Sequence, residues 1–88
     1  MSTLMVVYRG SKRLSQCDAR CYDGNGRACS CCCGGANHGV GLKEAIRNTL
    51  LRSKAYAEFY AVEQGYEPWE TRLVLPLSRT RMTALLGV

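Results

Sequence analysis

The chain has 88 residues, with 12 Lys or Arg against 7 Asp or Glu and a net charge of +5. A chain this short buries only a modest share of the surface that its unfolded form exposes, so it has room for only one domain. A two-domain enzyme is therefore excluded. It contains one Trp, one Phe and six Cys. Such a small core needs a cross-link or a bound metal to stabilise it, and the cysteines are the obvious residues to provide one.

No apolar run approaches the roughly 20 residues of a membrane span. The longest run near the start, residues 4–8, lacks the length, basic flank and cleavage site of a signal peptide. We therefore expect a cytoplasmic protein with no membrane contact.

The sequence predicts one α+β domain, residues 1–88, with two short strands, one central α-helix and a long Cys/Gly-rich loop. Residues 1–14 begin with an apolar, β-branched stretch and turn at Gly10, which predicts a strand over 3–8. Residues 15–41 hold all six cysteines and have no apolar periodicity. A loop of this length in a compact domain needs a source of order other than apolar packing, and we expect a metal to supply it.

After the loop, apolar residues recur at the three-and-four spacing of an amphipathic helix, which predicts a helix over 42–64. Within 65–88, the segment 72–77 alternates as a second strand, and Pro76 confines that strand to a sheet edge or a terminal position. With Ser78 as its cap, the C-terminal tail is expected to form a last short helix that packs Met82, Leu85 and Leu86.

The cysteines are closely spaced, in the pattern Cys17-x3-Cys21-x7-Cys29-x-Cys31-Cys32-Cys33. Thiols in a reducing cytoplasm are available to metals, and neighbouring cysteines rarely meet the geometry of an unstrained disulfide. We therefore expect a metal site rather than three disulfide bonds. Thiolates select zinc or iron–sulfur clusters over harder metals. Zn²⁺ is the first expectation, although the usual pair of C-x2-C knuckles is missing, and a 4Fe–4S cluster is the alternative.

If residues 29–33 are extended, alternate side chains share a face, and Cys32 points away from the others. The candidate ligands are then Cys17, Cys21, Cys29, Cys31, Cys33 and His38. These six residues exceed the four ligands of a single zinc ion, so either some of them do not bind the metal or the site holds more than one metal ion. His38 is either a fourth ligand or a hydrogen-bonding residue of the loop. Asn37 and the glycines around it are expected to shape the turn into the helix.

The run Cys17-Asp18-Ala19-Arg20-Cys21-Tyr22, followed by Cys29-x-Cys31-x-Cys33-Gly34-Gly35-Ala36-Asn37-His38-Gly39, resembles a motif of short uncharacterised proteins of phages, plasmids and other mobile elements. In those proteins the Gly-x-Asn-His-Gly stretch is also followed directly by a helix. The resemblance covers residues 17–50, brings no established activity and has no counterpart for Cys32. It implies a small regulator or inhibitor acting in the cytoplasm of a host cell.

The positive charge gathers in the first half of the predicted helix. Lys43, Arg47 and Lys54 fall within one sector at helical spacing, beside the metal loop, and Arg20 and Arg27 extend this basic stripe. Such a stripe can neutralise nucleic-acid phosphates, or it is only the solvated face of a basic protein.

The predicted function is a small metal-binding interaction module for nucleic acid or a host protein, with an iron–sulfur redox or sensing protein as the alternative. A protein partner is expected to contact Tyr66, Trp69 and the strand at 72–77. No enzyme activity is expected. The sequence provides one candidate pair of nucleophile and base, Cys32 and His38, and no third group that would orient them.

Overall fold

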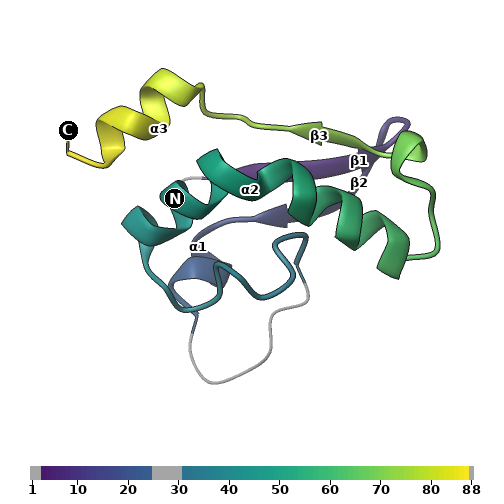
Figure 1. Cartoon of the computed structure of the whole chain (residues 1–88), viewed down its shortest axis with the longest axis horizontal. Coiled ribbons are helices and arrows are strands. Elements are labelled where there is room, and N and C mark those ends of the chain that lie inside the picture. Colours follow the sequence, from purple (N-terminus) through teal and green to yellow (C-terminus); the bar gives the residue numbers. More distant parts are fainter. Residues whose placement is uncertain (1–2, 25–30, 88) are drawn as a thin grey trace.

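The structure, a computed structural model, describes residues 3–24 and 31–87 (Figure 1). Its elements in chain order are β1 (Met5–Arg9), β2 (Lys12–Cys17), α1 (Ala19–Tyr22), α2 (Leu42–Glu63), the 3-10 helix η1 (Pro68–Glu70), β3 (Arg72–Val74) and α3 (Arg79–Leu85). The strands form one antiparallel sheet in the order β2-β1-β3, and α2 lies across it. The predicted α+β class with a central helix is confirmed. The prediction of two strands is wrong, because β2 is a third one.

β1 and β2 form a hairpin, so β2 takes the first residues of the segment that was expected to be metal loop. The strands pair from Arg9↔Lys12 to Met5↔Cys17, and Gly10 provides the turn with a φ of 62°. Only Leu14 is a large apolar residue in β2, so the strand shows no clear alternation of its own. Pairing with the apolar β1 fixes it, and places Cys17 at its buried end.

α2 begins and ends within one residue of the predicted helix. It follows Gly41, whose φ of 85° is a conformation that side chains disfavour. The residues on its buried face are mostly small, namely Ala45, Ile46, Thr49, Ser53, Ala57 and Ala61. Small side chains let the helix lie close to the sheet and to the cysteine loop.

β3 is shorter than the predicted strand at 72–77 and lies at the edge of the sheet beside β1. It ends at Val74, before Pro76, which has no N–H to donate to a neighbouring strand. The edge position predicted from Pro76 is therefore what the structure shows.

The predicted C-terminal helix is present as α3, and Ser78 caps it by accepting a hydrogen bond from the Arg81 backbone N–H at 3.1 Å. Met82 is fully buried, and Leu86 packs against the core from a partly buried position. The expectation that Leu85 packs inward is wrong, because 41% of its surface is exposed.

The described residues form two apolar clusters. The first lies between the sheet, α2 and the cysteine loop, and contains Met5, Val7, Cys17, Cys21, Cys32, Cys33 and Ala57. The second contains Leu4, Tyr22, Ala45, Ile46 and Met82. Cysteines dominate the first cluster, so the cysteine loop is part of the core rather than an appendage. Within the described residues, no helix combines the length and the apolar character that a membrane span requires.

Candidate metal centre

Four cysteine sulfur atoms from three segments come together under the sheet. Cys17 ends β2, Cys21 lies in α1, and Cys31 and Cys33 come from the turns that follow. All four sulfur atoms lie within 4.8 Å of one another. Cys31 Sγ is 3.1 Å from Cys33 Sγ and 3.5 Å from Cys21 Sγ. A group of four thiols at these distances can hold a metal ion.

Asp18 links the first two of these cysteines. It caps α1 by accepting a hydrogen bond from the Arg20 backbone N–H at 3.1 Å, and its other oxygen accepts from Gln16 at 2.7 Å. Burial opposes ionisation of Asp18, but the hydrogen bonds from Gln16 and Arg20 outweigh it and lower the pKa of this carboxyl. The cap thereby fixes the single turn of helix that directs Cys21 toward Cys17.

Consecutive turns bring Cys31 and Cys33 to the same place. Gly34 and Gly35 have φ values of 64° and 91°, which allow the chain to turn directly after the cysteines. The Gly39 backbone N–H then donates to the Cys21 carbonyl at 2.9 Å, tying the loop to α1. The Cys33 backbone N–H donates to Cys31 Sγ at 3.5 Å.

Asn37 has a role that the sequence analysis missed. Its side chain is fully buried, and its Nδ2 donates to Cys17 Sγ at 3.5 Å and to Thr49 Oγ1 at 3.4 Å. Asn48 in turn donates to Asn37 Oδ1 at 3.1 Å. Hydrogen bonds of this kind orient metal ligands and stabilise thiolate charge. The available signal was the pair of polar residues, Asn48 and Thr49, next to each other on a helix that directly follows the loop.

The structure does not bring His38 into the group of four sulfur atoms. Its two ring nitrogens are buried and have no hydrogen-bond partner among the described residues. The ring packs closely on Gly24, where an added Cβ would lie 2.8 Å from His38 Cε1. Two further predicted site residues, Cys29 and Arg27, lie outside the described residues.

Cys32 lies outside the group of four, as the sequence analysis expected, but for a different reason. Residues 31–40 form turns rather than the extended chain that the alternation argument assumed. The Cys32 backbone N–H donates to Ser15 Oγ at 3.0 Å, and the side chain is fully buried in the first apolar cluster.

The thiols are hydrogen-bonded to one another. Hydrogen bonds from Cys17, Cys32 and Cys33 lower the pKa of Cys31. The bond to Cys31, followed by burial, raises the pKa of Cys32, and bonds to Cys31 and Cys33 together with burial raise that of Cys17. Four ionised thiols at these distances would repel one another strongly, so a cation must balance their charge if all four ionise.

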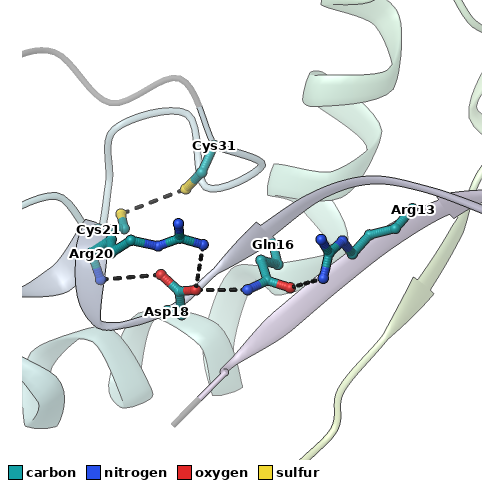
Figure 2. A network of polar contacts seen from close by, with 6 residues as sticks. All are labelled: Arg13, Gln16, Asp18, Arg20, Cys21 and Cys31. Carbon is teal, nitrogen blue, oxygen red and sulfur yellow. Dashed lines mark hydrogen bonds and ion pairs between the residues drawn. The ribbon is translucent and has the colours of Figure 1, made fainter. Parts of the chain in front are cut away.

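A cleft of about 520 Å³ opens beside this centre, and its lining includes Arg13, Gln16, Arg20, Cys21, Cys31 and His38. Figure 2 shows the contacts along it, from Arg13 on β2 through Gln16 and Asp18 to Arg20, with the two cysteines beside them. The Arg20 side chain is 78% exposed and lies 3.3 Å from Asp18. Its guanidinium therefore offsets the negative charge of Asp18 beside the cleft.

The other predicted basic residues lie apart from the cleft, on α2. Lys43, Arg47 and Lys54 are all exposed, and Arg47 pairs with Glu44 at 3.2 Å. They remain a surface of the helix rather than part of the sulfur site.

Comparison with known proteins adds no relative. No protein-family model matches the chain, and no curated protein and no solved structure is significantly similar to it.

Proposed function

We propose that the chain is a small binding module ordered by one zinc ion, with Cys17, Cys21, Cys31 and Cys33 as the ligands. The observation that carries this proposal is the approach of all four sulfur atoms to within 4.8 Å of one another. In a tetrahedral site with Zn–S bonds of about 2.3 Å, the sulfur atoms are about 3.8 Å apart. Small side-chain adjustments convert the observed spacing into that tetrahedron.

A 4Fe–4S cluster fits this spacing less well. Each iron of such a cluster carries one cysteine, and the irons stand apart, so the cysteine sulfurs spread more widely than around one ion. To hold a cluster, the sulfur atoms would have to separate against the packing of Cys17 and Cys33, which are almost fully buried. The compact group therefore favours a single ion, and thiolate ligands with a tetrahedral arrangement favour zinc.

Elemental analysis of the purified chain tests the metal directly. We expect one zinc per chain, a colourless protein, and a zinc X-ray absorption spectrum that fits four sulfur atoms at about 2.3 Å. A brown protein that contains iron and inorganic sulfide would establish the cluster instead.

Single serine substitutions test the ligand set. Cys21→Ser and Cys31→Ser should lose stoichiometric zinc, because three thiolates bind the ion far more weakly than four. Cys32→Ser is the matched control and should keep one zinc. It should still cost about 1 kcal/mol of stability, because a hydroxyl is more costly than a thiol to bury in this fully buried position. Loss of zinc from Cys32→Ser, or full retention by Cys31→Ser, contradicts this ligand set.

The proposed partner is nucleic acid, contacted by the exposed flank of α2 that carries Lys43, Arg47 and Lys54. The Arg47 pair with Glu44 is solvent-exposed and weak, so it leaves the guanidinium available to a phosphate. The net charge of +5 supports the same partner. Together with the motif resemblance to mobile-element proteins, this favours a small regulator or inhibitor that acts in a host cell.

Salt dependence tests the partner. Charge reversal at Lys43 and Arg47 should weaken binding and flatten the slope of log affinity against log salt by about one unit per lost contact. Arg81→Glu makes the same charge change on α3 and should lower affinity much less. If the zinc-loaded chain shows no retention on nucleic acid at about 50 mM salt, a host protein becomes the better candidate. Trp69, which is 80% exposed, would then be its anchor.

A further inference from the structure

The side of α2 that faces solvent carries a row of apolar residues. Leu51, Phe59 and Val62 expose 78%, 62% and 61% of their surface, and Ala55 is also exposed. The spacing of four, four and three residues places them in one row along the helix. The buried residues Thr49, Ser53, Ala57 and Ala61 lie on the opposite side. α2 thus carries an apolar row outside its buried face, and the described residues leave this row exposed.

This row is separate from the metal centre, since none of its residues lines the cleft beside the cysteines. Monomeric proteins seldom leave a contiguous apolar patch of several hundred Å² exposed, and such patches commonly mark interaction sites. We propose that the row binds a second copy of this chain, with two α2 helices packed antiparallel and crossing at Ala55.

The positions of the row are self-complementary in that arrangement. A two-fold axis at Ala55 places Leu51 of one copy opposite Phe59 of the other, and the same pair forms again on the far side of the axis. Alanine at the crossing point allows the two helices to approach closely. Leu51 and Phe59 therefore each meet a large apolar side chain of the other copy, the small residues meet in the middle, and Val62 lies toward the end of the pair, level with Asn48 of the other copy.

The charges along α2 select the antiparallel direction. Residues 43–54 of α2 carry Lys43, Arg47, Arg52 and Lys54 against Glu44, whereas its last turns carry Glu58 and Glu63 and no basic residue. A parallel pair would align like charges, and an antiparallel pair places the basic half of each helix beside the acidic half of the other. Lys54 and Glu58 of the second copy lie on the same flank of the row, with a difference in height of about 3 Å.

The area of the row is consistent with a weak dimer. The exposed apolar surface is on the order of 400 Å² in each copy, so two copies cover about 800 Å² of it. A specific interface needs roughly 1,000 Å², so the polar residues along both flanks would have to contribute the remainder. An area at the low end of specific interfaces is typical of weak association, so we expect the dimer to form only at high protein concentration. Lys43 and Arg47 lie toward the outer ends of such a pair, so nucleic-acid binding and dimerisation are compatible.

Analytical ultracentrifugation of the zinc-loaded full chain tests the association. From low micromolar to several hundred micromolar concentration, the average mass should rise from that of one copy toward that of two. Phe59→Glu should raise the dissociation constant at least tenfold with an unchanged circular dichroism spectrum, because Phe59 is mostly exposed in the single chain. Leu85→Glu is the matched control on α3 and should dimerise normally. A chain that stays monomeric at the highest concentration, or a dimer that tolerates Phe59→Glu, overturns the proposal.

Charge exchange tests the direction. Lys54→Glu and Glu58→Lys should each raise the dissociation constant several-fold, because each places two like charges together in the dimer. Mixing the two variants should restore wild-type affinity, since the mixed pair recovers both opposite-charge contacts. If neither variant weakens association, or if the mixture binds no better than either variant alone, the antiparallel arrangement is wrong. A monomeric wild-type chain would assign the row to a different protein partner.

Discussion

Two regions of this molecule are ordered in different ways. Around α2 and α3, the second cluster is held by apolar side chains such as Leu4, Ile46 and Met82. Residues 18–24 and 31–41 also contribute buried side chains to the two clusters, but they are held in addition by thiols, polar side chains and backbone hydrogen bonds, among them Gly41 N–H to the Tyr22 carbonyl at 2.8 Å.

The two regions meet at Cys17. This residue pairs with Met5 in the sheet, belongs to the first apolar cluster, and contributes one of the four sulfur atoms. Binding of the proposed ion would therefore be coupled to sheet packing through one side chain. We therefore expect order in the loop to depend on the proposed ion directly, and the helices to depend on it through this shared residue.

Removal of the metal is expected to have the largest effect. A strong chelator should abolish the cooperative thermal transition and most of the helical circular dichroism signal, and added zinc should restore both. Structural zinc contributes about 10–16 kcal/mol of binding free energy, which is as large as the whole net stability of about 5–15 kcal/mol of a small domain.

One result would contradict the view that the two regions are ordered in different ways. If the metal-free chain keeps its helical signal and melting temperature, apolar packing alone orders both regions. The four thiols would then be only core residues.

The parts of the fold that sequence predicts well are those with local signals. α2 follows from its apolar spacing and α3 from Ser78 as its cap, because both signals lie within a few residues of the element. β2 is missed because a polar strand has no pattern of its own and depends on its pairing with β1. Its last residue, Cys17, was for this reason placed in a loop.

The geometry of the candidate site, like β2, could not be predicted from local patterns in the sequence. Spacing alone indicates which cysteines are available, but the contact of Asn37 with Cys17 spans 20 positions and depends on how the loop returns to the sheet. The separation of Cys32 was expected from an extended chain, whereas it results from turns and a hydrogen bond to Ser15. Long-range geometry of this kind leaves no local pattern in the sequence.

Asn37→Asp tests the hydrogen bond that the Asn37 side chain donates to the Cys17 sulfur. The substitution keeps the volume of the side chain but can place a carboxylate oxygen where the amide donates to Cys17. We expect zinc affinity to fall about 10–100-fold, as for other residues that orient metal ligands. Competition with a chromophoric chelator measures it. Asn48→Ala is the control, because it removes support from Asn37 and leaves the contact with sulfur in place, so its effect should be clearly smaller.

Asp18→Asn tests the polar contacts of the loop with a pH dependence. Asparagine keeps the helix cap and removes the charge that pairs with Arg20. The folded pKa of Asp18 lies below its ordinary value of about 3.9, so its charge stabilises the fold above that pH and the benefit is lost as pH falls through the folded value.

The wild type should therefore exceed Asp18→Asn in unfolding free energy by about 1 kcal/mol at neutral pH. The difference should persist to about pH 5 and shrink below about pH 4. Urea denaturation of the two zinc-loaded chains measures it, and the subtraction cancels the acid release of zinc that both share. A difference that grows as pH falls contradicts the assignment.

Ser78→Ala has the smallest expected effect and probes the apolar region alone. Its hydroxyl accepts the hydrogen bond from Arg81 that begins α3, and α3 packs through Met82 into the second cluster, which contains no cysteine. Loss of this cap should lower the unfolding free energy by about 0.5–1 kcal/mol, and Ser78→Asp, which keeps a cap, should lower it less. The affinity of the folded chain for zinc should stay the same in both variants. A weaker zinc site in Ser78→Ala would show that α3 and the cysteine loop form one cooperative unit, and that the two regions are not ordered separately.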